Sequence, residues 1–357
     1  MDVVEKRKLD HKKRVRLGYL MAMFCAIFWA IWYIPGNLAW SLDPFVAMFD
    51  DIVGGGTSES SATLVVAVLI TGLNALTVVL ALTIWNLYLG KFKEMKRTII
   101  ELKGCTKYYF FGAICGGPIA ILGSFIASGF IGAAFAAVAA LAYPVIGTII
   151  SSSWLGQKIS KRALAGIFII LVGSITIYAI PMIDEITSGG IEWWGYIGGL
   201  MALCGWGIEG AVAAKGLDVS EPDVGIQIRF MLESVIWWVI AIPVLAIIGF
   251  PMYTYAAQIF EPVVFVVLIM MGITFGFCYV AWYKSFPLIG VGRGQGIGSL
   301  YGIFAVILIF LFVGEEPTLS LLFGGILCVA GTLIMFTENA EDLTCLRGDE
   351  GQQEEIP

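Results

Sequence analysis

Long apolar stretches separated by short polar segments make up most of the chain between residues 17 and 337. A helix needs roughly 20 apolar residues to cross the hydrocarbon core of a bilayer. This criterion predicts an all-α integral membrane protein with ten transmembrane helices. The predicted spans are 17–40, 62–89, 107–128, 131–154, 163–181, 194–214, 225–249, 261–284, 292–313 and 319–337.

The positive charges follow this division of the chain. With the N-terminus in the cytosol, all 21 Lys and Arg residues lie in or beside the predicted cytoplasmic segments, and the outer loops carry only acidic residues such as Asp50, Asp184 and Glu315. The positive-inside rule therefore predicts that both chain ends are cytoplasmic. They form a basic tail at 1–16 and an acidic tail at 338–357. We expect a multi-pass protein of the plasma (inner) membrane.

The two halves of the chain resemble each other. Residues 154–174 align with 312–332 without a gap, at an offset of 158, and the first helices align at an offset of 177. The aligned pairs include Gly18/Gly195, Trp29/Trp206, Gly132/Gly290, Tyr143/Tyr301, Gly156/Gly314, Gly166/Gly324 and Gly173/Gly331. Because each copy holds five helices, an odd number, the copies are predicted to be inverted in the membrane. Inverted repeats place a site between them near the middle of the bilayer.

The repeat predicts the domain organisation. The chain divides into a first five-helix repeat at 17–181, an outer connector at 182–193 and a second five-helix repeat at 194–337. The first repeat carries an inserted outer loop at 41–61, which is rich in Gly and Ser.

Composition excludes several classes of protein. The chain is 59% hydrophobic and 13% charged, with a mean hydropathy of +0.90, which excludes an ordinary soluble domain. Its seven cysteines give no disulfide framework. The single histidine, His11, lies in the basic tail, so histidine metal clusters and Ser-His or Cys-His pairs within the membrane are excluded. We expect no catalytic residues, no metal and no cofactor.

Charged residues inside the predicted spans are candidates for function. A carboxylate in hydrocarbon, such as Glu209, costs about 2.5–3.5 kcal/mol on insertion scales. It is expected to bind a cationic substrate or to take a coupling proton; the alternative is a structural carboxyl, hydrogen-bonded to a neighbouring helix or reaching toward Lys215. Arg229, Glu233 and Trp237 follow each other at intervals of four. They form either an ion-pair gate or a local pair that satisfies both charges, and Glu233 is the deeper candidate.

Aromatic residues at mid-span are candidates for the walls of a binding site. Trp32 aligns with Glu209 across the repeat. A carboxylate surrounded by indoles suits an ammonium group, because each cation–π contact contributes about 0.5–2 kcal/mol. Core packing is the alternative for any one of these aromatics. The predicted substrate-binding residues are Glu209, Trp32, Trp206, Glu233, Tyr279, Trp282, Tyr301 and Asn37, and the predicted gating or coupling residues are Glu209, Arg229 and Glu233.

Two motifs are predicted to interrupt helices. They are Pro35-Gly36-Asn37 in the first span and Gly116-Gly117-Pro118 in the third. Broken helices free backbone groups for a ligand; close helix packing is the alternative reading of such small residues. Asn74, Gln295 and Ser299 are further candidate polar liners.

Several short motifs occur in a recurrent order. They are FWAIWYIPGN and GWGIEGAV in the first helices of the halves, Ile228-Arg229-Phe230, Ala281-Trp282-Tyr283-Lys284-Ser285, and the spaced Gly-Glu and Gly residues from Gly314 to Gly331. With these motifs the chain resembles the EamA-type transporters, ten-helix members of the drug/metabolite transporter superfamily, over nearly its whole length. It departs from their pattern at Gln157, where an acidic residue is usual, and at Gly302, where the other half has Pro144.

The resemblance implies a secondary-active transporter that moves a small metabolite by alternating access. The carboxylates and indoles favour a cationic or zwitterionic amine. A neutral solute such as a sugar or nucleobase remains the alternative, followed by a membrane-embedded enzyme or a receptor. The expected partners are the small-molecule substrate and the lipid bilayer, without nucleic acid. A proton or sodium is the candidate coupling ion, and a monomer and a homodimer both stay open.

Overall fold

The computed structural model describes residues 3–156 and 160–336, and all of their regular elements are helices. The predicted tail at 338–357 and Gln157 lie outside the described residues. The helices are α1 (Val3–Ala39), α2 (Asp43–Gly54), α3 (Glu59–Tyr88), α4 (Phe92–Ile100), α5 (Lys103–Ile114), η1 (Cys115–Ile121), α6 (Leu122–Phe130), α7 (Ala133–Ala139), α8 (Tyr143–Leu155), α9 (Lys161–Ser188), α10 (Trp193–Gly216), α11 (Pro222–Val235), η2 (Ile236–Ala241), α12 (Ile242–Ile248), α13 (Met252–Ala256), η3 (Ala257–Phe260), α14 (Pro262–Ile289), α15 (Val291–Gly298), α16 (Tyr301–Val313) and α17 (Leu319–Phe336).

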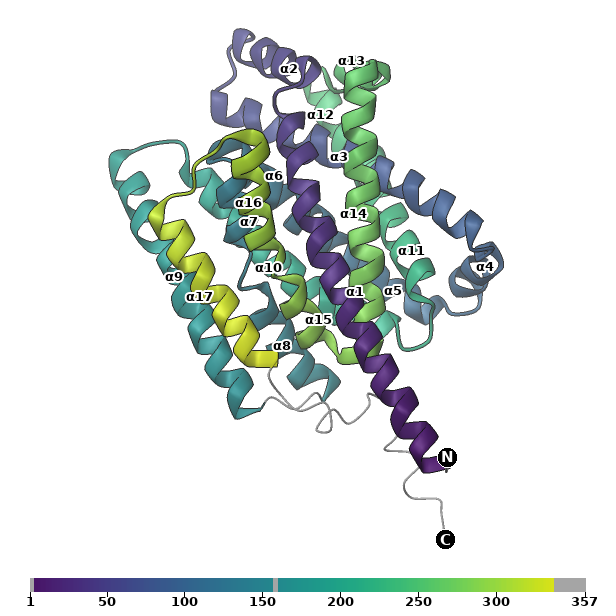
Figure 1. The fold of residues 1–357 in the computed structure, drawn as a ribbon. Helices are drawn as coiled ribbons and strands as arrows, with labels where there is room; N and C mark the ends of the chain where they lie inside the picture. The colour runs from purple at the N-terminus through teal and green to yellow at the C-terminus, as the bar shows by residue number, and fades with distance from the viewer. Residues whose placement is uncertain (1–2, 157–159, 337–357) are drawn as a thin grey trace.

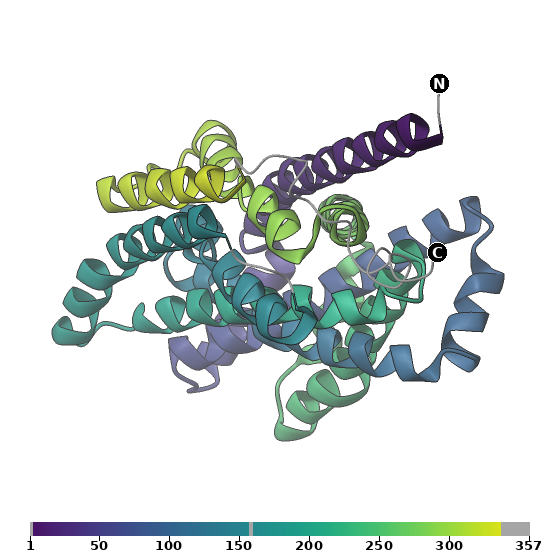
Figure 2. The ribbon, with the colours of Figure 1, turned by 90° about the horizontal axis from the view of Figure 1, so that it is seen from below.

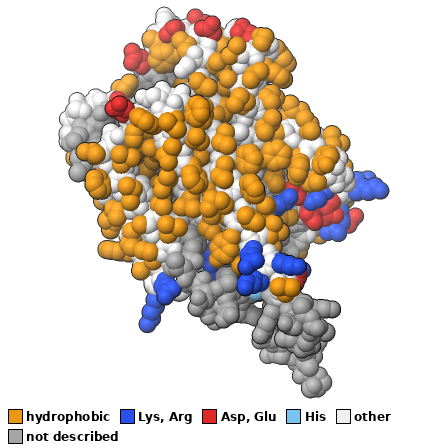
Figure 3. Space-filling model, in the orientation of Figure 1, with side chains coloured by type: hydrophobic (Ala, Val, Ile, Leu, Met, Phe, Trp, Pro, Cys, Tyr) orange, Lys and Arg blue, Asp and Glu red, His pale blue; other side chains and the backbone are white. Residues whose placement is uncertain are grey.

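The membrane-spanning character predicted from the sequence is confirmed. Within the described residues, nine helical stretches are long and apolar enough to cross a membrane, and a slightly shorter apolar helix follows at Leu319–Met335. These ten stretches coincide with the ten predicted spans. Apolar side chains cover most of the face seen in Figure 3, with acidic side chains at the end that carries α2 and Lys and Arg toward the other end.

Long helices pack side by side around α10. In Figure 1, α1 runs along α14, and α9 runs along α17. Seen from below in Figure 2, the α9–α17 pair forms one edge of the bundle, and α4 lies at the opposite edge. Helix α10 lies between them and contacts α5, η1, α6 and α8. A charge on α10 can therefore reach several neighbouring helices.

Glycines allow two pairs of helices to approach closely. Where α9 crosses α17, a Cβ added to Gly166 would lie 2.5 Å from the carbonyl oxygen of Gly331, and one added to Gly173 would lie 2.6 Å from that of Gly324. Near the middle of α1, Gly18 packs against the side chain of Ile289, the last residue of α14. Small residues permit this backbone-to-backbone packing in a membrane.

Four spans depart from a regular α-helix. The fourth is divided into α7 and α8 just before Tyr143, and the ninth into α15 and α16 just before Tyr301. The third and seventh each contain a π-helical segment, η1 and η2. The predicted departure at Gly116-Gly117-Pro118 is thus confirmed in the form of a π-segment, a feature frequent at functional sites.

The predicted interruption at Pro35-Gly36-Asn37 is wrong, because α1 continues through Pro35 to Ala39. A proline removes one backbone hydrogen bond, but without competing water the remaining bonds keep the segment helical. Helix α1 also begins at Val3, inside the predicted tail, and α9 extends to Ser188 in the predicted connector.

The outer segment 41–61 holds a helix, α2, that the prediction treated as loop. Pro44 stands in its first turn, and Phe45, Met48 and Ile52 are buried. Their spacing of three and four residues aligns them on one face, which packs on the bundle. The same amphipathic spacing was readable in the sequence, and the Gly- and Ser-rich surroundings obscured it.

Candidate functional site

Three charged side chains meet inside the bundle. Glu209 comes from α10, and Arg229 and Glu233 come from α11, where they are one helical turn apart; all three have 0% exposure. The Arg229 Nε donates a hydrogen bond of 2.6 Å to Glu209 Oε1, and its Nη1 donates to Glu233 Oε2. We call Glu209, Arg229 and Glu233 the charged triad. Sequence reasoning proposed these same three residues, and the structure brings them into direct contact.

Tyrosines and tryptophans hold the two carboxylates of the charged triad. The hydroxyl groups of Tyr279 and Tyr283 donate to Glu209 at 2.8 and 3.2 Å. The indole of Trp206 in turn donates to the Tyr279 hydroxyl at 2.9 Å. On the other carboxylate, Trp237 Nε1 donates to Glu233 Oε1 at 3.2 Å. Each carboxylate is thus oriented by at least one aromatic donor besides Arg229.

The guanidinium of Arg229 also lies against aromatic rings. Its Cζ is 4.1 Å from the centroid of the Phe230 ring and 4.9 Å from that of Tyr279. Within such a distance the ring quadrupole attracts the cation. The arrangement demonstrates that this cluster of aromatics accommodates a planar cation beside two carboxylates.

The π-segment η1 makes the space that the charged triad occupies. A Cβ on Gly116 would lie 1.9 Å from Arg229 Nη2, and one on Gly117 would lie 2.6 Å from the carboxyl carbon of Glu233. The triad therefore packs against bare backbone, which only glycine provides. Segment η1 lies beside α10, and the side chains of Arg229 and Glu233 reach both glycines from α11.

The charges of the triad do not balance. Two carboxylates accompany one guanidinium, which leaves one net negative charge when all three are ionised. The Arg229 Nη2 has no hydrogen-bond partner among the described residues. An uncompensated charge in such a buried position is costly. The triad can therefore take up one further positive charge, such as a proton or a cationic group, together with an acceptor for Nη2.

An aromatic cluster extends from the triad toward α1 and α16. Trp29 stacks on Tyr301 with ring centroids 4.4 Å apart and meets the edge of Trp206 at 4.7 Å. Trp282 lies 5.9 Å from Trp29 and 5.3 Å from Tyr279. The structure thus brings Trp206, Tyr279, Trp282 and Tyr301 together beside the triad, with Trp29 at their centre.

Two predicted binding residues lie further away. Trp32 stacks on Phe275 at 4.2 Å and donates to Asn74 Oδ1 at 3.1 Å. It is linked to the triad through Phe275, which contacts Tyr279 and Phe230. Asn37 lies, partly exposed, near the end of α1. None of the hydrogen bonds that the structure describes joins its side chain to the triad.

The remaining predicted polar liners have structural partners. Gln295 Nε2 donates to the carbonyl oxygens of Trp206 and Gly207 at 3.0 and 3.3 Å. The Ser299 hydroxyl donates to the Gly296 carbonyl oxygen at 2.6 Å, within its own helical turn. Ser299 lies at the division between α15 and α16, whereas Gln295 lies inside α15 and joins it to the backbone of α10.

Sequence reasoning missed two polar residues, Tyr283 and Asp223. Tyr283 stands one turn after Tyr279 on α14, so the spacing of four was a usable signal. Asp223 follows Pro222 in the first turn of α11 and is fully buried. Nothing in the sequence around Asp223 distinguishes it from an ordinary acidic residue at a helix start.

A charged and aromatic site enclosed in an apolar bundle of about ten helices defines a multi-pass membrane protein of the transporter type. Residues 193–337 match the EamA-like transporter family. Its members normally transport small solutes across membranes and are not enzymes. The resemblance drawn from the sequence motifs is thereby confirmed.

A solved structure supports the fold over nearly the whole chain. It is titled only "Crystal structure of protein", shares 15% sequence identity and has a TM-score of 0.57. The similarity covers 92% of this chain and 98% of that chain. At this identity it supports the fold alone. No curated protein matches the chain.

Proposed function

We propose that the protein is a secondary-active carrier that moves a small cationic or zwitterionic amine by alternating access. The charged triad is its substrate site. The observation that carries this proposal is the fully buried arrangement of Glu209, Arg229 and Glu233 with one net negative charge. A membrane protein keeps such groups away from water at considerable cost, which favours a role in the passage of a solute or ion.

The alternating-access mechanism is supported by packing that follows the internal repeat. At an offset of 158, Gly166 and Gly331 correspond to Gly324 and Gly173, and each glycine meets the backbone of its partner in the reciprocal pair. A two-fold relation between the halves produces this kind of exchange. Two inverted five-helix repeats, at 17–181 and 194–337, would rock about this crossing.

The first helix of each half supports the same relation. Gly18 packs against Leu288 and Ile289, and its counterpart Gly195 packs against Phe130 and Ile131. Phe130 and Ile131 stand 158 residues before Leu288 and Ile289, so the contacts are equivalent. With the Lys- and Arg-rich end in the cytosol, the protein lies in the plasma (inner) membrane with both termini inside.

The coupling of amine transport to protons follows from their competition for the one net negative charge of the triad. A proton on Glu209 or Glu233 neutralises the triad, and so does an ammonium or guanidinium group beside them. The two occupants exclude each other because a second positive charge would leave the buried site unbalanced. Exchange of a proton for a cationic amine is therefore the transport cycle that we propose.

Counterflow in proteoliposomes tests the carrier. Labelled amines, amino acids, sugars and nucleobases are offered in turn to the purified protein. We expect exchange of an amine. Exchange of a sugar or nucleobase alone would move the assignment to a neutral solute, and no exchange of any solute by folded protein would contradict the carrier itself.

Glu209→Gln tests the role of the triad. Hydrogen bonds to charged groups contribute about 1.5–3 kcal/mol, and 1.4 kcal/mol is tenfold, so amine exchange should fall about tenfold or more and lose its pH dependence. Glu94→Gln is the matched control, because Glu94 pairs with Arg97 near the surface. An unchanged pH profile in Glu209→Gln would make Glu209 a structural carboxyl.

A further inference from the structure

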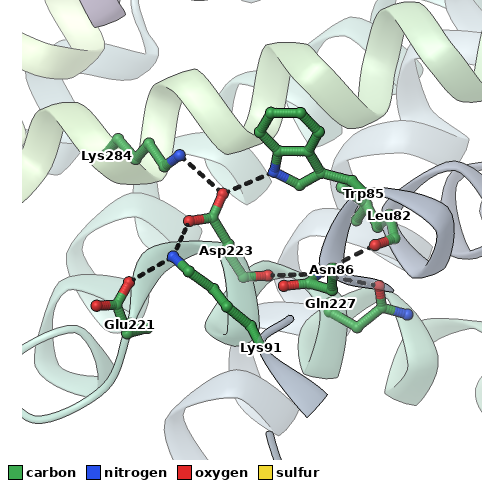
Figure 4. A network of polar contacts seen from close by, with 8 residues as sticks. All are labelled: Leu82, Trp85, Asn86, Lys91, Glu221, Asp223, Gln227 and Lys284. Carbon is green, nitrogen blue, oxygen red and sulfur yellow. Dashed lines mark hydrogen bonds and ion pairs between the residues drawn. The ribbon is translucent and has the colours of Figure 1, made fainter. Parts of the chain in front are cut away.

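A buried carboxylate outside the triad, Asp223, receives three donors from other parts of the chain. Lys284 Nζ and Trp85 Nε1 donate to Oδ1 at 2.8 and 2.9 Å, and Lys91 Nζ donates to Oδ2 at 2.6 Å (Figure 4). The Asp223 side chain itself has 0% exposure. Both of its oxygens are thus satisfied, in contrast to the Arg229 Nη2 of the triad.

The network around Asp223 ties together helices that are far apart in the sequence. Trp85 belongs to α3, Lys91 follows α3, Asp223 begins α11, and Lys284 lies near the end of α14. Lys91 also pairs with Glu221 at 2.8 Å, so two lysines balance two carboxylates. We call Trp85, Lys91, Glu221, Asp223 and Lys284 the Asp223 network.

Backbone and amide contacts strengthen the same junction. Asn86 Nδ2 donates to the carbonyl oxygen of Asp223 at 3.2 Å, and Gln227 Nε2 donates to Thr83 Oγ1 at 3.0 Å (Figure 4 shows Asn86 and Gln227). The first two turns of α11 are therefore held to the last two turns of α3. These contacts fix the N-terminal end of α11, which lies toward the Lys- and Arg-rich end of the bundle.

The Asp223 network lies between the charged triad and the Lys- and Arg-rich end of the bundle. Asp223 precedes Arg229 by six residues on α11, about 9 Å along the helix axis. On α14, Lys284 directly follows Tyr283, whose hydroxyl donates to Glu209. Two helices thus carry a triad contact and a network contact in succession.

Water reaches both lysine side chains of the network. The side chains of Lys91 and Lys284 are 26% and 30% exposed. Ion pairs at such positions contribute modestly to stability, since water can replace the partner. A junction that must open and close repeatedly needs contacts of this reversible kind. The fully buried triad does not offer them.

We propose that Asp223, with Lys91 and Lys284, is the inner gate of the carrier. In the closed state of this structure, the carboxylate on α11 holds α3 and α14 together and separates the triad from the cytosol. In the inward-open state α11 separates from α3 and α14, and water hydrates the two lysines and the Asp223 carboxylate. This proposal rests on the alternating-access carrier proposed above. It gives Asp223 a role in closing the site without contact to the substrate.

Thiol labelling from the two sides of the membrane tests the gate. Gly112→Cys, with the native cysteines replaced by alanine, puts a thiol beside the triad, because a Cβ there lies 3.9 Å from Arg229, Glu209 and Tyr283. A membrane-impermeant maleimide is applied to vesicles of either orientation. Asp223→Asn should raise the labelling rate from the cytosolic side about tenfold and lower it from the outer side.

Opposite changes in labelling rate on the two sides of the membrane distinguish a gate from a residue that only stabilises the fold. A residue that only stabilises the fold would, when removed, raise labelling from both sides together, and that result would overturn the proposal. Unchanged rates would overturn it as well. If Asp223→Asn does not fold, Lys284→Met is used, which removes one donor and should shift the rates in the same directions by a smaller factor.

Glu94→Gln is the matched control, since it removes a part-exposed carboxylate that pairs with Arg97 outside the Asp223 network and leaves all three donors of Asp223 in place. Its labelling rates should change less than twofold. Labelling requires no transported solute, so it tests the gate independently of counterflow, which tests the carrier. Counterflow with unchanged labelling would refute the gate alone, whereas shifted labelling without counterflow of any solute would contradict the carrier.

Discussion

The charged triad and the Asp223 network share one helix, α11, which contributes residues to both, and both contain a carboxylate without exposed surface. They differ in how completely their groups are paired. In the network two part-exposed lysines balance two carboxylates, and every Asp223 oxygen has a donor. In the triad all three side chains are buried, one negative charge is in excess, and one guanidinium nitrogen has no partner within the described residues.

The difference shows that burial of a charge does not by itself mark a binding site. A paired and balanced cluster has nothing left to offer a ligand, and its contacts hold helices together. An unbalanced cluster retains capacity for one more charge and one more hydrogen bond. This criterion assigns substrate binding to the triad and closure to the network, and three variants test it.

The largest effect is expected from Arg229→Met, which leaves two buried carboxylates without their cation. Removal of one partner from a buried ion cluster costs about 3–5 kcal/mol, so the variant should unfold at a clearly lower temperature. Lys284→Met, in the network, should cost about 1 kcal/mol or less because its pair is part-exposed. Thermal unfolding in detergent, followed by tryptophan fluorescence, measures both.

The double variant Arg229→Met with Glu233→Gln is the control for Arg229→Met. Removing one carboxylate relieves part of the imbalance, so part of the lost stability should return. Equal destabilisation by Arg229→Met and Lys284→Met would break the distinction between the two clusters.

A smaller effect, on transport more than on stability, is expected from Gly116→Ala. The added Cβ would lie 1.9 Å from Arg229 Nη2 and 2.3 Å from Glu209 Oε2, so the triad must shift. Overpacking of this kind costs about 1–3 kcal/mol, equivalent to about tenfold or more in affinity for the amine. Amine counterflow at several concentrations separates this loss of affinity from a loss of protein.

Gly112→Ala is the matched control, four residues earlier in the same span. Its Cβ would meet the same triad at 3.9 Å, an ordinary van der Waals distance. Counterflow by Gly112→Ala should stay within about twofold of the unmodified protein, because the added methyl group would contact the triad without overlapping it. A similar loss in both variants would show that the glycines serve helix packing rather than the triad.

Much of the fold was predictable because it depends on local composition. Apolar length alone predicts the ten spans, and a charge inside an apolar run, such as Glu209, stands out without any knowledge of its neighbours. The spacing of Arg229 and Glu233 predicts their contact, since it involves one helix only. Each of these inferences uses information contained within a single helix.

What the sequence did not reveal depends on contacts between helices. Asp223 resembles any acidic residue near a helix start, where the helix dipole favours it, and only packing brings Lys91 and Lys284 to it. The role of Gly116 depends likewise on which helices face η1. The apparent interruption at Pro35 was misread because the effect of a proline depends on whether its surroundings maintain the other hydrogen bonds.

The smallest effect concerns a third carboxylate, Glu315, which is half-buried between α16 and α17. Its two oxygens accept hydrogen bonds of 3.0 Å from the backbone N–H groups of Ala133 and Ala134 at the start of α7. Burial raises the pKa of Glu315 above its ordinary value of 4.5, although the two backbone hydrogen bonds act in the opposite direction. Like Asp223 it joins distant segments, but with an uncharged partner.

The raised pKa fixes the sign of the pH dependence. Above the ordinary value of 4.5 and up to the raised pKa, the folded protein binds the Glu315 proton more tightly than the unfolded chain does. Stability from this group is therefore highest in acid and is lost as the pH rises through that window. Glu315→Gln should remove this loss and otherwise cost about 1 kcal/mol or less, because it gives up one of the two backbone hydrogen bonds.

Thermal unfolding of the protein and of Glu315→Gln at matched pH values, from about 4 to neutral, isolates this group. The gap between the two curves should change across the window above 4.5 and be constant above it. Parallel curves would mean that the carboxylate is not buried against α7 as the structure has it. A glutamine fits this position in principle, because Gln157 occupies the aligned place in the first half. The amide oxygen can accept from one of the two backbone N–H groups, so the variant keeps one of the two hydrogen bonds without a charge. A connection between helices tolerates this neutralisation, which the charged triad should not.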